Sequence, residues 1–211
     1  MKRRPRHAAY LIETIQQMPM FHTHVKDSHL KISAIGAEVG VSEGATSAQL
    51  LSHFPKLHLL MIDSWRETPP EERQTACKDY LEALTQDEHD KAKQKALSVT
   101  EFAEERRTVF HLTSQKAAGR IEDGALDFVF LDGDHSEAGV LRDLEAWFPK
   151  VRRGGLFAGH DWGSKQLQGV TRAVNGFLEK KNLPLMVAKY KTWWTIKWDY
   201  SPTTPISSVK S

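Results

Sequence analysis

Residues 38–51 read Glu-Val-Gly-Val-Ser-Glu-Gly-Ala-Thr-Ser-Ala-Gln-Leu-Leu, and they join an apolar run of strand length to a helical pattern. Glycines at such a junction let the backbone pass close to a ligand, and the helix that follows offers free backbone N–H groups to an anion. Glycines also occur at such turns simply for tight packing of strand against helix. A second feature favours a ligand site, because the next apolar run ends at Asp63, where a carboxylate can accept hydrogen bonds from ribose hydroxyls.

The spacing of the glycines disfavours a dinucleotide cofactor. Gly40 and Gly44 are separated by three residues, Ser42 stands where the G-x-G-x-x-G pattern has its second glycine, and the third glycine is missing. A nicotinamide-dependent oxidoreductase would need that pattern to bind the pyrophosphate. We therefore expect a nucleoside-containing ligand without a pyrophosphate.

Short apolar runs alternate with helical stretches along the rest of the chain, which is typical of β/α units around a parallel sheet. We expect strands at residues 32–39, 57–62, 108–112, 126–131 and 156–159. Two later runs, 185–189 and 192–198, are predicted to form an antiparallel hairpin at the sheet edge. The predicted fold class is α/β, a Rossmann-like seven-stranded and mostly parallel sheet with helices on both faces and an N-terminal cap helix.

Three segments follow from this pattern. Residues 1–30 are expected to form the cap helix and a substrate loop, residues 31–198 a single α/β domain, and residues 199–211, rich in Ser, Thr and Pro, a flexible tail. An apolar face on the cap helix can pack on its own domain or on a second copy, so a homo-oligomer stays open.

Composition narrows the class of protein further. The 211 residues carry a formal net charge of only +2, which is too small to imply a nucleic-acid partner. The only cysteine, Cys77, cannot form an intrachain disulfide, and no apolar run has the length of a signal peptide or a membrane span. We expect a cytoplasmic protein with neither nucleic acid nor membrane as its partner.

Polar residues gather after two neighbouring strands. Asp132, Asp134 and His135 follow the run at 126–131, and His160-Asp161 follows the run at 156–159, with one predicted helix at 137–148 between them. Because the carboxyl ends of parallel strands meet at one edge of a sheet, the two groups should converge. Capping of the following helix explains one acid but not a group on two strands.

Oxygen-rich ligands of this kind suit a hard divalent cation such as Mg²⁺, which leaves room for substrate oxygens. A substrate hydroxyl at such a cation becomes more acidic. Histidine at position 160 also admits a softer metal such as Mn²⁺, Fe²⁺ or Zn²⁺.

An acid followed by a glycine turn resembles motif I of the class I S-adenosylmethionine-dependent methyltransferases, and the likeness runs from about Lys31 to Trp198. More narrowly, the chain resembles the metal-dependent catechol and sugar O-methyltransferase-like group. The resemblance implies S-adenosylmethionine as cofactor, a divalent metal, and a hydroxyl of a small molecule or sugar as methyl acceptor, with a catechol-like ring also open.

The resemblance also implies roles for individual residues. Glu38 would lie near the methionine amino group and Thr46 near its carboxylate, while Gly40, Ser42 and Gly44 form the turn. The remaining implied cofactor residues are Asp63 and Ser64 at the ribose, Ser114 and Gln115 at the adenine, and Asp132; the implied metal ligands are Asp132, His160 and Asp161. Ser114 is also a plausible helix cap.

The catalytic base is less well defined by the pattern. The position three residues after the first metal acid is often lysine in that group but is His135 here, and histidine titrates near neutral pH. Asp134 is the competing candidate. Substrate contacts are expected from Phe21, His22, His24, Trp65, Asp134 and Trp162, whereas Trp147, Trp193, Trp194 and Trp198 are expected to pack in the core.

Other functions remain as alternatives. A noncatalytic S-adenosylmethionine-binding module would bind cofactor without turnover, and the acidic group argues against it. A metal-independent methyltransferase would use His135 as its base. Methylation of nucleic acid would rely on the basic residues between Lys2 and Arg6, which are better explained as a solvated chain start.

Overall fold

The computed structural model describes residues 6–17, 34–68 and 83–198. Within them, seven strands form one sheet in the order β3-β2-β1-β4-β5-β7-β6. The first five strands are parallel, whereas β7 runs antiparallel to β5 and β6 antiparallel to β7. The strand bounds are β1 Ala34–Val39, β2 Leu57–Asp63, β3 Arg107–His111, β4 Leu126–Leu131, β5 Val151–Gly159, β6 Met186–Val187 and β7 Trp193–Ile196.

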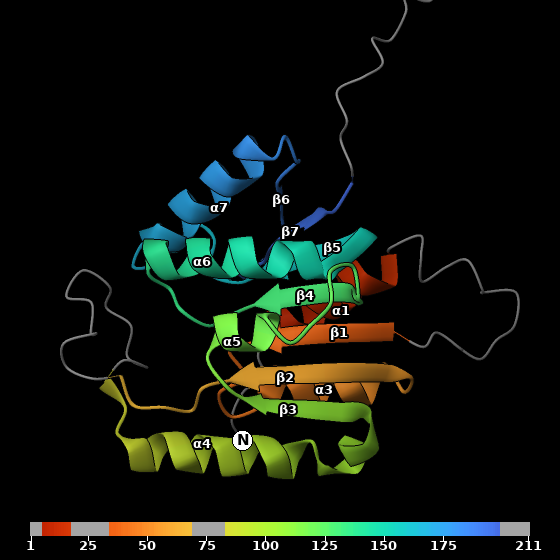
Figure 1. Ribbon diagram of the computed structural model, residues 1–211, viewed down its shortest axis with the longest axis vertical. Helices are drawn as coiled ribbons and strands as arrows, with labels where there is room; N and C mark the ends of the chain where they lie inside the picture. The colour runs from red at the N-terminus through yellow and green to blue at the C-terminus, as the bar shows by residue number, and fades with distance from the viewer. Residues whose placement is uncertain (1–5, 18–33, 69–82, 199–211) are drawn as a thin grey trace, which may run out of the picture.

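Helices cover both faces of the sheet (Figure 1). On one face lie α1 (Arg6–Gln17), α3 (Ala45–His53) and α4 (Gln86–Val99), and on the other lie α5 (Ser114–Ala118), α6 (Glu137–Trp147) and α7 (Gln168–Lys180). Short 3₁₀ helices, η2 (Glu101–Arg106) and η3 (Phe148–Lys150), lead into β3 and β5. The molecule is therefore a three-layer sandwich with a buried sheet.

The central strand β4 shows why the sequence folds in this way. Phe128 and Phe130 pack with the layer of α1 and α3, whereas Val129 and Leu131 pack with the layer of α5, α6 and α7. Alternate side chains point to opposite faces of a strand, so a continuous apolar run fills both cores at once. The run at 126–131 thus requires a strand that is covered on both sides.

Local signals set the ends of several elements. Helix α4 begins after Thr85, whose hydroxyl accepts a hydrogen bond from the Glu88 backbone N–H while the Glu88 carboxylate accepts one from the Thr85 backbone N–H. Helix α6 begins after Ser136, whose hydroxyl accepts from the backbone N–H of Gly139. Both arrangements satisfy donors that the first helical turn leaves without a partner.

The predicted fold class is confirmed, including the antiparallel edge hairpin. Two details of the prediction are wrong. Strand β5 begins at Val151 rather than 156, because Val151 already pairs with Leu126 and the pairing with β4 resumes at Leu156 after a register shift. Trp198 is 54% exposed, although Trp147 and Trp193 are buried in the core as expected.

Among the described residues, no helix combines the length and the apolar character that crossing a bilayer requires. The predicted substrate-loop residues Phe21, His22 and His24 lie outside the described residues, as do Cys77 and the segment 199–211.

Candidate active site

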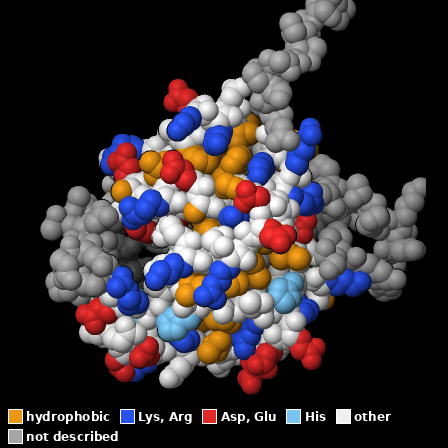
Figure 2. All heavy atoms as spheres, viewed as in Figure 1, with side chains coloured by type: hydrophobic (Ala, Val, Ile, Leu, Met, Phe, Trp, Pro, Cys, Tyr) orange, Lys and Arg blue, Asp and Glu red, His pale blue; other side chains and the backbone are white. Residues whose placement is uncertain are grey.

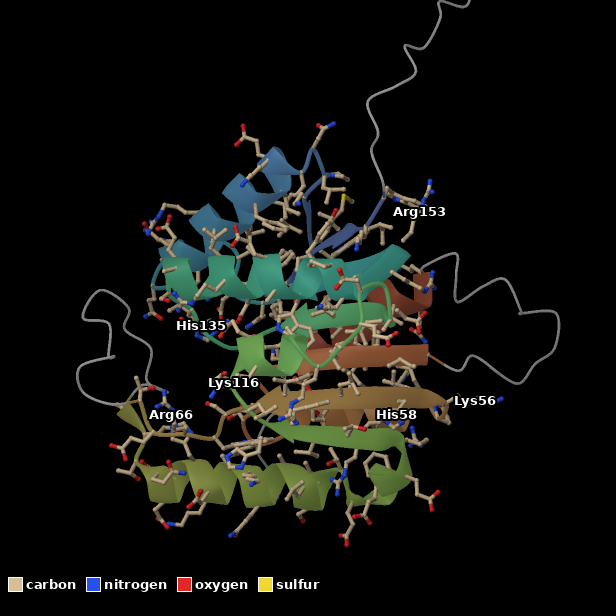
Figure 3. The ribbon with its side chains drawn as sticks, in the orientation of Figure 1. Lys56, His58, Arg66, Lys116, His135 and Arg153 are labelled. Atoms are coloured by element: carbon tan, nitrogen blue, oxygen red, sulfur yellow. The ribbon has the colours of Figure 1, made fainter. Side chains whose placement is uncertain are left out.

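The residues predicted to form the site gather at the edge where the parallel strands end. The turn after β1, Asp63 at the end of β2, and the residues after β4 and β5 all lie there, on the left side of Figure 1, toward which the strand arrows point. Figure 3 shows His135 and Arg66 on this edge and Lys56 and His58 on the opposite one. A backbone hydrogen bond of 2.7 Å from the Asp132 N–H to the Val39 carbonyl holds the ends of β4 and β1 together.

The turn after β1 requires its glycines. Gly40 has φ +92°, and a Cβ at this position would lie 2.2 Å from the carbonyl oxygen of Asp132. Gly44 has φ +76°, and its Cβ would lie 2.7 Å from the Cα of Ala96 on α4. Both positions therefore exclude side chains, for reasons of conformation and of space.

Asp63 fastens this turn from the end of the neighbouring strand. One carboxylate oxygen accepts a 2.8 Å hydrogen bond from the Ser42 backbone N–H, and the other accepts a 2.7 Å bond from the Trp65 backbone N–H. The Trp65 indole N–H in turn donates to the Ser42 carbonyl at 2.9 Å. Trp65 is only 1% exposed, so its indole supports the turn from within, and the residue also lines the neighbouring cavity.

A cavity of about 560 Å³ opens between the turn and the ends of β2 and β4. That volume is in the range of small-molecule binding sites. Seven of the ten residues predicted to bind the cofactor or line its turn contribute to the wall, namely Gly40, Ser42, Asp63, Ser64, Ser114, Gln115 and Asp132.

Ser114 and Gln115 are organised by an acid that the sequence reading missed. Asp143 on α6 accepts hydrogen bonds from the Ser114 hydroxyl at 2.5 Å and from the Gln115 amide at 2.7 Å. The Trp147 indole N–H donates to the Ser114 oxygen at 2.8 Å. Burial raises the pKa of Asp143 to about 6, against the opposing effect of the hydrogen bond from Ser114. Ser114 is the first residue of α5, so its side chain serves this network rather than a cap.

Two residues predicted to lie near the methionine part of the cofactor contact other side chains of the protein. Glu38 is 2% exposed and accepts a hydrogen bond from the Ser47 hydroxyl. Burial raises the pKa of Glu38 to about 8, although the Ser47 bond acts against the shift. Thr46 is buried, and its hydroxyl lies 2.9 Å from Nε2 of His7 on α1.

The two polar groups after β4 and β5 do converge. His160 Nδ1 lies 3.3 Å from Asp132 Oδ1 and 3.2 Å from Asp161 Oδ2. His135 Nε2 lies 3.7 Å from Asp132 Oδ1 and 3.4 Å from Asp161 Oδ2. The four side chains are largely buried, with exposed fractions between 11% and 19%. We call these four residues the His–Asp cluster.

Electrostatics in the cluster favour charged carboxylates facing nitrogen. Burial opposes ionisation of Asp132, but hydrogen bonds with His135 and His160 prevail and lower its pKa to about 2. Burial likewise opposes the charge on His160, yet its contacts with Asp132 and Asp161 raise its pKa to about 9. The pKa of Asp161 is lowered, since its bond with His160 outweighs burial.

The orientation of His160 suits a metal ligand. Its Nε2 lies 2.9 Å from the carbonyl oxygen of Tyr190, and because a carbonyl only accepts, Nε2 carries the hydrogen. Nδ1 then faces the carboxylates of Asp132 and Asp161, and once it has released its proton it can present its lone pair to a cation between them. A ligand histidine held by a backbone carbonyl through its other nitrogen is the usual arrangement in metal sites. The donor set therefore fits a divalent cation.

Other predicted residues lie beside the cluster rather than in it. Asp134 accepts a 2.8 Å hydrogen bond from the Ser136 backbone N–H and has Arg142 at 3.6 Å, so its carboxylate is engaged at the start of α6. The Trp162 indole N–H donates to the Asn175 side chain at 2.9 Å. Lys191 lies 3.6 Å from the outer oxygen of Asp161.

His7 is a residue that sequence reading did not identify. Its Nε2 lies 3.7 Å from Asp132 Oδ2, and its ring centroid lies 4.3 Å from that of His160. No local pattern marks it, because it stands in a basic chain start far from both partners in sequence.

Comparison with known proteins places the chain in a family. Residues 37–162, more than half of the chain, match the model of a family described as a methyltransferase domain. No curated protein sequence is similar enough to this chain to count as a match.

Solved structures share the fold at low sequence identity. The O-methyltransferase NovP is 15% identical, with 89% of this chain and 79% of that chain covered and a TM-score of 0.62. The calicheamicin methyltransferase CalS11 is 15% identical, with 92% and 80% covered and a TM-score of 0.58. Precorrin-6y C5,15-methyltransferase from Geobacter metallireducens is 13% identical, with 93% of each chain covered and a TM-score of 0.59. With its matched family, its sheet order and its turn after β1, the chain belongs to the class I S-adenosylmethionine-dependent methyltransferases.

Proposed function

We propose that the protein is a divalent-metal-dependent O-methyltransferase that methylates a hydroxyl of a small molecule or sugar. The observation that carries this proposal is the position of Asp132, which lines the cofactor cavity and also belongs to the His–Asp cluster. A methyl donor and an activated acceptor must lie side by side for transfer, because the reacting atoms have to approach in line. Asp132 joins the two sites at one residue.

The cofactor side is assigned to the cavity. S-adenosylmethionine supplies a methyl group on a sulfonium centre. Asp63, already fixed by the backbone of the turn, has lone pairs left for ribose hydroxyls, and Ser114 and Gln115 border the region for the adenine. The buried Glu38 supports the turn from below through Ser47.

The acceptor side is assigned to the His–Asp cluster. Asp132, His160 and Asp161 would hold the cation, and a bound cation supplies Lewis acidity that lowers the pKa of a hydroxyl. His135 Nε2 would take the hydroxyl proton, and S-adenosylmethionine held in the cavity would supply the methyl group to the oxygen and leave as S-adenosylhomocysteine. The engagement of Asp134 with Ser136 and Arg142 favours His135 over Asp134 as the base.

The acceptor class rests on the site and on the neighbouring folds. NovP is described as an O-methyltransferase, and CalS11 as a TDP-rhamnose 3'-O-methyltransferase. The formal net charge of only +2 supports a small acceptor over a nucleic acid, and the face drawn in Figure 2 carries both acidic and basic side chains. A sugar or another molecule with neighbouring hydroxyls would supply oxygen ligands of the kind that a divalent cation prefers.

The test is calorimetric titration of Mg²⁺, Mn²⁺ and Ca²⁺ into metal-stripped protein saturated with S-adenosylhomocysteine. Asp132→Ala and Asp161→Ala should abolish the heat of metal binding. Asp123 is an exposed acid paired with Lys150, and Asp123→Ala should leave that heat unchanged. Methyl transfer to a panel of sugars and catechols is then measured with each metal.

Two outcomes would redirect the proposal. If titration of the cofactor gives a saturable heat of binding but titration of each metal gives none, a metal-independent methyltransferase with His135 as base would be favoured. If both cofactor and metal bind but no methyl group is transferred to any hydroxyl acceptor, a noncatalytic S-adenosylmethionine-binding module would be favoured.

A further inference from the structure

We propose that His7, carried by the amino-terminal helix α1, is an additional ligand of the metal, and that metal binding thereby fastens α1 to the site. This inference rests on the metal site of the proposed function and adds a ligand to it from a separate element of the fold. It also predicts which class of divalent cation the site selects.

The geometry brings His7 within reach of two predicted ligands. Ligand atoms of His7, Asp132 and His160 all lie within 4.8 Å of one another. If each side chain shifted by about an ångström, its ligand atom could lie about 2 Å from a cation placed between the three residues, which is the usual length of a metal–nitrogen or metal–oxygen bond. His7 approaches Asp132 from Oδ2, while His135 and His160 approach from Oδ1. The two sides of one carboxylate are thus both lined by imidazole.

Helix α1 has the packing needed to present His7. Leu11 and Ile15 are buried against the sheet, and His7 lies one turn before Leu11 on the same helical face. The His7 ring stacks on Phe130 with centroids 5.8 Å apart and an interplanar angle of 15°. At the other end of α1, the Gln16 amide donates to Nε2 of His53 on α3 at 2.7 Å. The apolar face therefore directs the His7 side chain toward the end of β4.

A purely structural role for His7 is the competing explanation. Its Nε2 lies 2.9 Å from the Thr46 hydroxyl, a contact that by itself would dock α1 on the turn. In that position Nε2 of His7 still lies 3.7 Å from Asp132, and the nitrogen can exchange its hydrogen bond with the hydroxyl for a bond to a cation. The two explanations differ in their dependence on the metal.

The donor set indicates the class of cation. Two imidazoles, from His7 and His160, and the carboxylate of Asp132 make a mixed nitrogen and oxygen set, and Asp161 contacts His160 beside it. Imidazole suits Mn²⁺, Fe²⁺, Co²⁺ and Zn²⁺, whereas Mg²⁺ prefers oxygen ligands and retains its waters. A site that includes His7 should therefore select a transition metal over Mg²⁺.

The experiment compares Co²⁺ and Mg²⁺ binding to the full chain by calorimetry, with the visible absorption of bound Co²⁺ as a second readout. His7→Ala should weaken Co²⁺ binding by at least about tenfold and change the Co²⁺ spectrum. Removing a residue that only hydrogen-bonds to a ligand already costs at least about tenfold in metal affinity, and removing a ligand itself should cost more. Mg²⁺ affinity should change much less. Ile12→Ala, which loosens α1 packing without touching the cluster, should keep the Co²⁺ affinity and spectrum.

Hydrogen exchange of the α1 amides tests the coupling directly. Co²⁺ should slow exchange across residues 8–15 in the wild type and in Ile12→Ala, but not in His7→Ala. His7→Gln, which keeps a polar side chain able to reach Thr46, serves if His7→Ala unfolds, and it should behave as His7→Ala does.

The outcomes separate this inference from the proposed function. If Asp132→Ala keeps its metal affinity, the metal site itself is wrong. If Asp132→Ala loses metal while both His7 variants keep the Co²⁺ affinity, the spectrum and the α1 protection, only the role of His7 is overturned. Equal loss of Co²⁺ and Mg²⁺ in the His7 variants and in Ile12→Ala would assign His7 to helix docking alone.

Discussion

The carboxylate of Asp63 accepts a 2.8 Å hydrogen bond from the backbone N–H of Ser42, across the gap between β2 and the turn after β1. The same carboxylate holds the Trp65 backbone N–H with its other oxygen. Ser42 has φ +49°, a conformation that non-glycine residues seldom adopt, so this bond stabilises a strained backbone. Asp63 therefore shapes the cavity wall in addition to lining it.

Replacing Asp63 with Asn should weaken both the turn and cofactor binding. An amide has one accepting oxygen and one donating nitrogen, so it leaves one of the two backbone N–H groups facing a donor. The expected cost is about 1–3 kcal/mol of unfolding free energy, with roughly tenfold weaker binding of S-adenosylhomocysteine. Urea denaturation and calorimetry measure the two effects. Asp123→Asn is the control, and equal unfolding free energy in both variants would contradict a structural role for Asp63, as equal cofactor affinity would contradict its role in the cavity.

Gly40→Ala should cost more than the equivalent change at another left-handed glycine. Gly40 and Gly163 have φ of +92° and +76°, but a Cβ at Gly40 meets the Asp132 carbonyl at 2.2 Å whereas at Gly163 nothing lies within 4 Å. Backbone strain alone costs about 1–2 kcal/mol in either variant. The Gly40 variant should lose additional stability and its cofactor binding, as measured by denaturation and by titration with S-adenosylhomocysteine. Similar losses in the two variants would show that the close approach to Asp132 is easily relieved.

Asp143 should make stability fall as pH rises. Its pKa of about 6 in the folded protein lies above the ordinary value of 3.8, so the folded state holds the proton more tightly than the unfolded state. The contribution is full below about pH 4 and is lost as pH rises through about 6, with a maximum of about 3 kcal/mol.

The check on Asp143 is the difference in unfolding free energy between wild type and Asp143→Asn, measured from pH 4 to pH 7. Asparagine still accepts from Ser114 and Gln115, so the comparison isolates the titration. The advantage of the wild type should shrink across this range. A constant difference would place the pKa of Asp143 near its ordinary value.

His135→Ala should separate proton transfer from metal binding. Loss of a general base typically costs about 10²–10⁴-fold in rate. We expect that loss in methyl transfer, with metal affinity in calorimetry changed far less than in Asp132→Ala. Because His135 Nε2 also lies 3.4 Å from Asp161, a loss of metal affinity equal to that of Asp132→Ala would instead make His135 a ligand.

The sheet was predictable because its signals are local. Every residue of the run at 126–131 is apolar except Asp127, so both faces of the predicted strand are apolar. The structure has β4 over the same residues. Strand β5 was predicted too short because its first residues include Arg152 and Arg153, which carry no apolar pattern. These residues lie at the register shift between β4 and β5, whose position depends on the neighbouring strand and is not encoded locally.

The site was predictable only in part. Polar residues directly after buried strands marked Asp63, Asp132, His160 and Asp161, since the edge where parallel strands end is common to all of them. Asp143 was missed because an acid within an amphipathic helix is usually solvated, and only packing of α6 against α5 buries it beside Ser114 and Gln115.

The sequence by itself determined the alternation of strands and helices, the glycine turn, and the convergence of acids and histidines at one edge, because these depend on short-range periodicity and on the ends of strands. Only the tertiary structure decided that the Tyr190 carbonyl orients His160, that Asp143 holds the wall of the cavity, and that α1 brings His7 beside Asp132. Each of these pairs joins residues far apart in the chain. Their contact is decided by how the buried faces of whole elements pack, which no local pattern records.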